Sequence, residues 1–433
     1  MSVIVAVCPV PTDKVSGEVI SMNRNIRITG SKWYQIMAQS LLVTSVIFAG
    51  SAHAGDAERQ QAKRIHDRLT GTPPTNQMID ILEPMMSNPV TAALYVIDNN
   101  PAFYNVTLKN FAAPWTNEAQ DVFVPLNDYT ATVIGMIRDN VDFREVLYGN
   151  HLYIGQGVSP AYSNASNNHY EALEALGPVS GDLSNNSILV ARTQTQVTGL
   201  PDPATAGVMT TRAAAEAFFS GGTNRAMLRF TFMNHLCTDF EPLKDITRVP
   251  DHVRRDVSRS PGGDSRIFLN NCVGCHAGMD GLAGAFAYYE FNEDTAAMEY
   301  RAASNKFDAN GVSLKHNINE NNFKYGYITT DDSWINYWRN GQNKLLGWSD
   351  TAVLDENGHS FGNGAKSMGA ELAHTRAFST CQVKKAFKAV CFRDADDYSA
   401  DRAQVNTIAT EFESDGGNMR NVFAKVAAYC KGP

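Results

Sequence analysis

The feature that most constrains this chain is a pentapeptide at residues 272–276, with the sequence Cys-Val-Gly-Cys-His. Two thiols at this spacing can each bond to one vinyl group of a haem, and the following imidazole can bind the iron. The small Gly274 between the thiols allows the backbone to approach the macrocycle closely. The pattern predicts one covalently attached haem c, held by Cys272 and Cys275 with His276 as the proximal iron ligand.

Two other chemistries use a Cys-x-x-Cys pair. A zinc site needs a second pair of ligands at similar spacing, and the sequence has neither a second Cys-x-x-Cys nor a His-x-x-x-His. A thioredoxin-like redox pair needs a strand–helix setting, whereas Ser260-Pro261-Gly262-Gly263 precedes the motif and small residues follow it. Haem attachment is therefore the preferred interpretation.

Because haem is coupled to thiols outside the cytoplasm, this interpretation requires an export signal. The N-terminus has the three parts of one: basic residues, an apolar run and a small-x-small site. They are Arg24, Arg27 and Lys32, then residues 41–49, then Ala52-His53-Ala54. We predict cleavage after Ala54, so that residues 1–54 are a leader, with Met22 as a second candidate translation start. The apolar run is too short for a permanent membrane anchor.

Charge and hydropathy limit the partners of the mature chain. Without residues 1–54 it has 33 Lys and Arg against 43 Asp and Glu, a net charge of −10. An acidic protein is a poor partner for nucleic acid or anionic lipid. No other segment is long and apolar enough for a transmembrane anchor. We expect a periplasmic or secreted protein whose partner is another redox protein.

Four cysteines of the mature chain lie outside the haem motif: Cys237, Cys381, Cys391 and Cys430. An oxidising compartment favours two disulfide bonds among them, the alternative being four buried free thiols. Cys381 and Cys391 fall on one predicted helix, about 15 Å apart, which is beyond disulfide reach. Each should therefore bond either Cys237 or Cys430, and the sequence leaves the pairing open.

The predicted fold is mainly α-helical with long loops. Residues 55–205 form an N-terminal helical region, and residues 206–433 form a haem-binding, cytochrome c-like C-terminal region. Residues 149–203 are rich in Asn, Ser and Gly, which indicates loop with short strands. Apolar periodicity and capping residues predict helices at 57–69, 77–82, 89–96, 101–111, 129–138, 142–148, 210–219, 224–236, 266–271, 331–339, 366–374, 378–392 and 403–429.

The second axial position of the iron decides between electron transfer and oxygen or peroxide chemistry. Met368, in the glycine-rich stretch 362–369, is the leading candidate for the sixth ligand. Met279 is only three residues past His276, on the proximal side, so we expect it to pack in the core. An open site is the other alternative, as is ligation by His316, His359 or His374.

Two groups of residues near the motif are candidate haem contacts. Four arginines precede it, and their guanidinium groups suit haem propionates, although nearby Asp251, Asp256 and Asp264 offer salt bridges instead. We take Arg254, Arg255 and Arg266 as propionate candidates, with Arg259 in the same cluster. Four aromatic residues that follow the motif could equally wall the haem or form ordinary core: Phe286, Tyr288, Tyr289 and Phe291.

Three segments then occur in an order typical of one protein family. They are Gly207-Val208-Met209-Thr210, Gly221-Gly222-Thr223-Asn224-Arg225 and Cys275-His276-Ala277-Gly278-Met279-Asp280. This order resembles the uncharacterised haem-binding modules first noted in planctomycete cytochromes and widespread in exported proteobacterial proteins. Residues 378–383 resemble the C-terminal module of that family, and residues 64–69 more weakly resemble its N-terminal module.

The resemblance covers most of the mature chain and implies haem attachment at Cys272 and Cys275 with ligation by His276. It implies no activity, because none is assigned to these modules. Gly281 stands where the family often has Pro, so the resemblance does not fix the conformation after Asp280.

The sequence therefore favours an exported monohaem c-type cytochrome that transfers single electrons. Its length exceeds the roughly 100 residues of a minimal carrier, which keeps two alternatives open. One is a peroxidase- or oxygenase-like haem enzyme with an open sixth position, for which no catalytic residue can be named. The other is a haem-containing subunit of a larger redox assembly.

Overall fold

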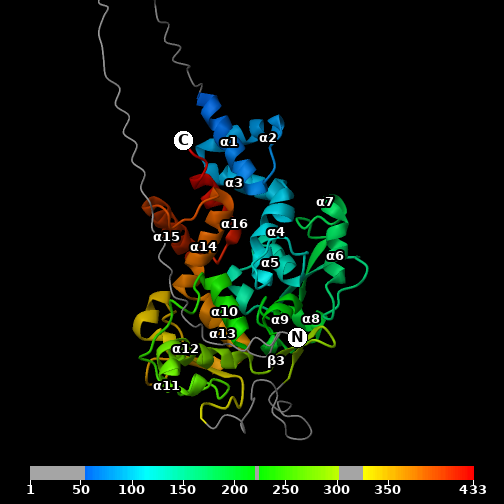
Figure 1. The fold of residues 1–433 in the computed structure, drawn as a ribbon. Helices are drawn as coiled ribbons and strands as arrows, with labels where there is room; N and C mark the ends of the chain where they lie inside the picture. The colour runs from blue at the N-terminus through cyan, green and yellow to red at the C-terminus, as the bar shows by residue number, and fades with distance from the viewer. Residues whose placement is uncertain (1–53, 220–223, 302–324) are drawn as a thin grey trace, which may run out of the picture.

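The computed structural model describes residues 54–219, 224–301 and 325–433. In these ranges the chain is mainly helical, with three small antiparallel sheets of two strands each. Figure 1 shows the N-terminal and C-terminal helices together at one end and the helices of the haem motif at the other. The predicted mainly α fold is confirmed. The predicted leader, residues 1–54, lies outside the described residues except for Ala54, where the first helix begins.

The N-terminal helices pack directly against the C-terminal ones (Figure 1). The α1 helix buries Ala62, Ile65 and Leu69, and Thr75 caps α2 by accepting a hydrogen bond from the backbone N–H of Met78. These helices are α1 (Ala54–Thr70), α2 (Asn76–Leu82) and α3 (Pro89–Asn99), and α3 packs on α16 (Met419–Tyr429). One hydrophobic core thus runs through both predicted regions, 55–205 and 206–433.

The central helix is α5 (Asp128–Arg138), which is buried along its whole length. Asn127 caps it through a hydrogen bond from the backbone N–H of Thr130. A π-helical segment, Phe103–Leu108, leads into α4 (Lys109–Ala112), which packs on α5. Short 3-10 turns complete this part of the chain at Glu83–Ser87, Ala113–Thr116 and Phe143–Leu147.

Residues 149–203 form the excursion that the composition predicts, with more structure than expected. Strands β1 (His151–Gly155) and β2 (Leu189–Thr193) pair antiparallel, with His151 opposite Thr193. Three short helices here are not predicted from the sequence, because they are too short for a periodic pattern to be visible. They are α6 (Asn168–Ala175), α7 (Gly177–Ser180) and α8 (Gln194–Thr198).

The haem-motif region combines helices with the other two sheets. Its helices are α9 (Arg212–Phe218), α10 (Asn224–Thr231) continued by a π segment at Phe232–Leu236, α11 (Ser265–Ile267), α12 (Val273–Ala283) and α13 (Gly364–Ala373). Its strands are β3 (Tyr289–Asn292) paired with β4 (Ala297–Tyr300), and β5 (Ser333–Asn336) paired with β6 (Ser360–Asn363).

The prediction of a helix at 331–339 is wrong. Residues 333–336 form strand β5, and only Tyr337–Arg339 makes a 3-10 turn. The cause is a pairing with residues about thirty positions further along: Trp334 lies opposite Gly362, and Ile335 opposite Phe361. Local capping signals cannot reveal such a partner.

The prediction of one helix over 403–429 is also wrong. The chain forms α15 (Ser399–Ser414), a turn, and then α16. The turn contains Gly416 and Gly417, both with positive φ, a conformation that other residues rarely adopt.

The two predicted disulfide bonds are confirmed, and the structure settles their pairing. Cys237 bonds Cys381, and Cys391 bonds Cys430. Both start from α14 (Arg376–Cys391), the helix that the sequence predicted at 378–392. Within the described ranges, no helix is long and apolar enough to span a bilayer.

Candidate haem site

The pentapeptide lies at a junction between two helical segments. A π-helical segment, Phe268–Cys272, continues from α11 and leads directly into α12, so the chain is helical through both cysteines and His276. Asp264 caps α11 by accepting the backbone N–H of Arg266. The helix predicted at 266–271 is therefore present, and it extends through Ala283 instead of ending near the motif.

The motif has a small hydrophobic cluster of its own. Five buried residues form this cluster, separate from the main core: Val253, Phe268, Cys272, Val273 and Ala277. Cys275, three residues further along the helix, is half-buried against the main core and takes part in no disulfide. Burial raises the pKa of its thiol, and its Sγ lies 3.7 Å from the carbonyl oxygen of Phe240.

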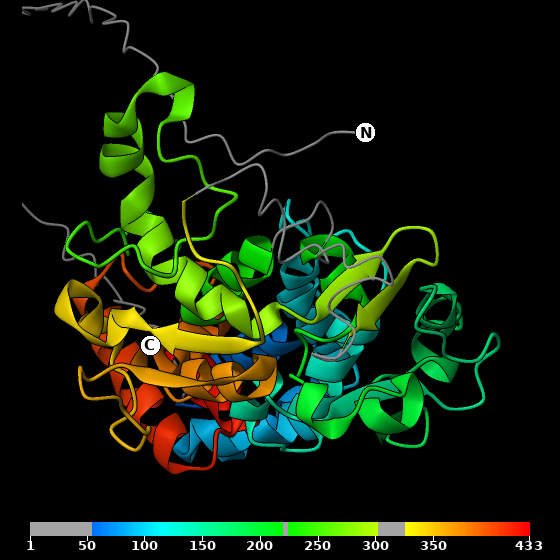
Figure 2. The same ribbon diagram turned by 90° about the horizontal axis from the view of Figure 1, so that it is seen from below.

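Glycines seat α12 against the rest of the molecule. A Cβ at Gly278 would lie 2.1 Å from Nε1 of Trp338, and one at Gly281 would lie 2.8 Å from the carbonyl oxygen of Ile335. Because these positions have no side chain, α12 lies close against strand β5 and the turn after it, as Figure 2 shows from below. Gly274, predicted to allow close approach of the haem, abuts the side chain of Lys244.

His276 lies over a buried carboxylate on its own helix. Its Nδ1 is 3.3 Å from both carboxylate oxygens of Asp280, one helical turn further on, at the long end of the hydrogen-bond range. The Asp280 side chain is fully buried, and that of His276 is 12% exposed. With Nδ1 facing Asp280, the opposite nitrogen, Nε2, is the one available to a metal.

Asp280 is held in place by Arg225 from the start of α10. The guanidinium of Arg225 donates two hydrogen bonds to the Asp280 carboxylate, from Nε at 2.7 Å and from Nη2 at 2.9 Å. It donates two more to the Asp256 carboxylate, at 2.7 and 2.8 Å. Burial alone would raise the pKa of Asp280, but the charge of Arg225 holds it well below its usual range. Asp280 is therefore ionised at neutral pH.

Arg254 has a buried charge whose donors are not all used. The residue is 6% exposed, and its Nε and Nη2 have no hydrogen-bond partner among the described residues. Its backbone N–H donates to Asp280 at 3.1 Å, which places it beside the His276 network. Burial lowers the pKa of Arg254, but a guanidinium remains charged in proteins. A buried, partly unsatisfied guanidinium suits an anionic ligand.

The other predicted propionate ligands differ from Arg254. Arg266 is largely exposed, with 82% of its side chain accessible, and pairs with Asp264. Arg255 donates to the carbonyl oxygen of Gly326 at 3.1 Å. Arg259 lies over the Phe268 ring at 4.6 Å and donates to backbone carbonyls. Burial and unsatisfied donors thus distinguish Arg254 within the cluster.

The candidate sixth ligands are spread over the molecule. Met368 on α13 is completely buried in the main core, and Met279 is also in that core, as expected for it. His359 contacts Asp355 at 3.1 Å, and His374 is exposed at the end of α13, stacked on Tyr148. His316 lies outside the described residues. Ligation by Met368 stays a prediction.

The aromatic residues after the motif are core residues. Phe286 and Tyr289 are at most 2% exposed and pack against Phe219, with ring centroids 5.6 and 5.9 Å apart respectively. Phe291 belongs to the same main core, and Tyr288 is buried. Core packing, one of the two roles considered for this group, is confirmed.

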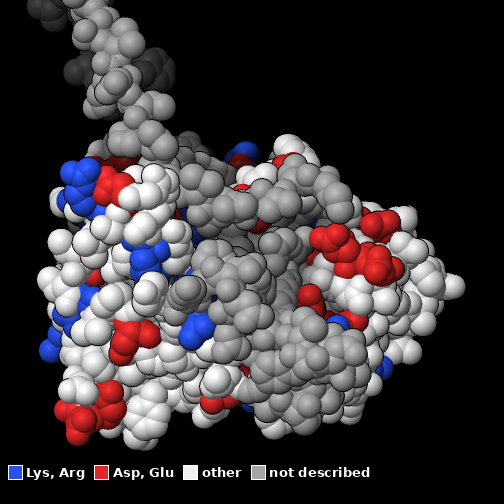
Figure 3. All heavy atoms as spheres, turned by 60° about the horizontal axis from the view of Figure 1, so that its bottom comes forward, with Lys and Arg blue, Asp and Glu red and all other residues white. Residues whose placement is uncertain are grey.

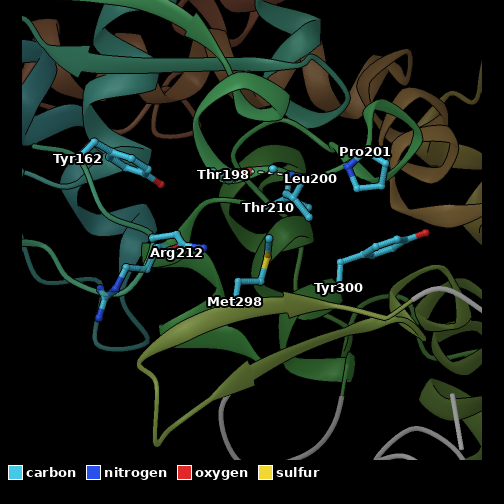
Figure 4. A pocket seen from close by; sticks show the side chains of 10 residues that line it. Tyr162, Thr198, Leu200, Pro201, Thr210, Arg212, Met298 and Tyr300 are labelled. Carbon is cyan, nitrogen blue, oxygen red and sulfur yellow. Dashed lines mark hydrogen bonds between the residues drawn. The ribbon is translucent and has the colours of Figure 1, made fainter. Parts of the chain in front are cut away.

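A separate pocket of about 200 Å³ lies between β4 and the loop around Thr198 and Thr210. Figure 4 shows Tyr162 and Tyr300 on opposite sides of it, with Arg212 and Met298 below. Arg212 is paired with Glu216, so its charge is already neutralised. None of the lining residues belongs to the pentapeptide or the arginine cluster.

Sequence reasoning missed Asp280, Arg225 and Asp256 as a unit. Two of them lie in segments that carry the family resemblance, and the structure joins these segments through the contact between Arg225 and Asp280. A usable signal existed in the spacing of His276 and Asp280, four residues apart as on one face of a helix. The predicted helix ends at residue 271, before the motif, so this spacing carried no weight in the prediction.

Comparison with protein-family models, with curated proteins and with solved structures gives no match for this chain. In the described part of the chain, no group of three or more His, Cys, Asp or Glu side chains could hold a metal ion. Figure 3 shows the molecule with its lower side turned forward, where acidic side chains gather at the right of the described surface and basic and acidic ones are interspersed at the left.

Proposed function

We propose that the chain is an exported monohaem c-type cytochrome that transfers single electrons to a redox partner protein in the periplasm or outside the cell. A haem bound here would supply one iron that is reversibly oxidised and reduced. The region around the haem would then act as in a cytochrome c, and one helix would carry the residues that attach the haem.

The observation that carries the proposal is the position of Arg254 beside the motif. Cys272, Cys275 and His276 offer two thioether positions and one axial nitrogen on a continuous helical segment. Arg254 is linked to the same helix through Asp280 and keeps two unsatisfied, buried donors. A propionate would satisfy those donors and neutralise the buried charge, which is costly without a partner.

The residues of this chain would bind and orient the haem. The thiols of Cys272 and Cys275 would fix its edge, Nε2 of His276 would bind the iron, and Arg254 would pair with a propionate. Two apolar side chains near the motif are exposed to solvent, Leu269 at 56% and Ile246 at 67%, and a haem could cover them. Two disulfide bonds suit a protein of an oxidising compartment.

The test is haem content of the full chain produced in a host that attaches haem to exported proteins. We expect wild type to carry one haem that resists acid–acetone extraction. The single variants Cys272→Ala and Cys275→Ala should carry less, and the double variant none. The double variant C391A/C430A, which removes two cysteines outside the motif, is the matched control. Extraction-resistant haem in C272A/C275A, or none in wild type, would contradict the proposal.

An optical spectrum of the same protein separates electron transfer from enzymatic chemistry. A low-spin spectrum that carbon monoxide does not change means that both axial positions are filled, as in an electron carrier. A high-spin spectrum that changes at once with carbon monoxide would overturn electron transfer as the main function.

A further inference from the structure

The proposed haem site includes a carboxylate that neither the motif nor the arginine cluster predicted. We propose that Asp280 is the positioning residue of His276, a buried carboxylate that fixes the imidazole with Nε2 toward the iron and stabilises the ferric state. This inference deepens the proposed function and rests on it.

Geometry is the first argument. Both oxygens of Asp280 lie 3.3 Å from Nδ1 of His276, and the two residues are four apart on α12. When Nδ1 donates its proton to this carboxylate, the lone pair of the ring lies on Nε2. Metal-bound histidines commonly donate their second ring nitrogen in this way, and a carboxylate acceptor increases the electron donation of the ring.

Burial and charge are the second argument. The Asp280 side chain is fully buried, so solvent does not compete for its oxygens. Arg225 and the backbone N–H of Arg254 bind the same two oxygens and hold the carboxylate in one orientation. Arg225 is fixed in turn by Asp256, so the acceptor of His276 is part of a rigid chain of ion pairs.

A structural role alone would not need this arrangement. Arg225 and Asp256 already form a two-pronged ion pair that joins α10 to the segment before α11. Asp280 is a second carboxylate on the same arginine, and its oxygens also contact His276, the one imidazole of the pentapeptide. The expected consequence is a lower reduction potential, because electron donation from His276 favours the ferric iron.

The experiment compares the reduction potentials of wild type, Asp280→Asn and Asp256→Asn. Both variants lose one negative charge beside Arg225, but only D280N changes the acceptor of His276, so D256N is the control for charge alone. We expect D280N to retain covalent haem and to shift the ferric–ferrous equilibrium at least tenfold toward ferrous, about 59 mV. The shift in D256N should be less than a third of that in D280N.

Each outcome has a distinct meaning. Wild type without covalent haem refutes the proposed function itself. Covalent haem in all three proteins with equal shifts in D280N and D256N, or with no shift in D280N, overturns the role of Asp280 and leaves the proposed function intact. If D280N does not accumulate, ¹⁵N NMR of histidine-labelled wild type answers the question. A slowly exchanging, strongly hydrogen-bonded Nδ1 proton supports the proposal, and a rapidly exchanging one overturns it.

Discussion

At the scale of single residues, the arginine cluster shows how burial separates side chains that the sequence treats alike. Four arginines occur within thirteen positions before the motif, and nothing in their order singles out one of them. The structure gives three of them carbonyl or carboxylate partners and leaves Nε and Nη2 of Arg254 buried without a partner among the described residues. The free energy of unfolding of the protein should therefore depend strongly on whether an anion binds Arg254.

Replacing Arg254 by Met should have opposite effects with and without haem. In the haem-free C272A/C275A background, R254M removes a buried charge with unsatisfied donors, so the free energy of unfolding should rise by about 1–3 kcal/mol. In the haem-carrying protein the same change should lower it, because a propionate loses its partner. The measurement is urea unfolding of R254M and its parent protein, once in the haem-free background and once with haem.

The exposed Arg266 supplies the matched control for that experiment. R266M should leave the free energy of unfolding essentially unchanged in either background, as expected for a solvent-exposed ion pair. If R254M and R266M behave alike, Arg254 has no special role in binding an anion.

A second residue-scale prediction concerns Asp401, which joins three elements at the C-terminal end. It accepts hydrogen bonds from Arg393 at 2.7 and 2.9 Å and from the hydroxyl of Tyr429 at 2.8 Å. The hydrogen bonds from Arg393, opposed by burial, lower the pKa of Asp401 below its value in an unfolded chain. Its stabilising effect is thus fully present above the unfolded pKa, about 3.9, and is lost as pH falls through the folded pKa.

Asp401→Asn should therefore cost about 1.5–3 kcal/mol of unfolding free energy at pH 7, and the cost should shrink as pH falls below about 4. Urea unfolding at several pH values measures this. The exposed Asp397 nearby is the control, and D397N should show no such pH-dependent difference. A cost for D401N that is independent of pH would contradict the assignment.

At the scale of elements, sequence periodicity predicted long helices well and non-local pairing poorly. The helices at 57–69 and 378–392 are long, and the first is predicted by polar, helix-favouring residues that end at the Gly and Pro of residues 70–74. Strand β5 is not visible in the local sequence because its partner strand begins only at Ser360, and α12 is not predicted because its small residues resemble a loop. Asp280 was lost as a site residue for this second reason.

The glycines of α12 are explained by packing, which sequence alone cannot show. Gly278→Ala should force a Cβ into the indole of Trp338, which is completely buried, and cost about 1–3 kcal/mol of unfolding free energy. Because Trp338→Leu makes room at the same contact, the double variant should cost less than the sum of the single variants by about 1 kcal/mol. Additive costs in urea unfolding would show that the two residues do not press on each other.

At the scale of the whole molecule, helix α14 connects the end of the molecule that carries the motif to the end where the N-terminal and C-terminal helices pack together. Cys381 ties α14 to the segment after α10, in the half that carries the haem motif, and Cys391 ties it to the end of α16, which packs on α3. The sequence established which cysteines could not pair, but only the fold shows that each bond joins α14 to a different end. A single core across residues 55–205 and 206–433 likewise does not follow from chain length, which allows two domains or one large one.

The two disulfide bonds should contribute unequally to the stability of this single core. They close loops of 144 and 39 residues, for which restriction of the unfolded chain predicts about 5 and about 4 kcal/mol respectively. C237A/C381A should therefore lower the free energy of unfolding by about 1 kcal/mol more than C391A/C430A. Urea unfolding measures both, with an unchanged slope required for a valid comparison. Because the shorter loop ties α16, which packs on both α3 and α14, the opposite order would mean that native contacts at the C-terminal end outweigh chain entropy.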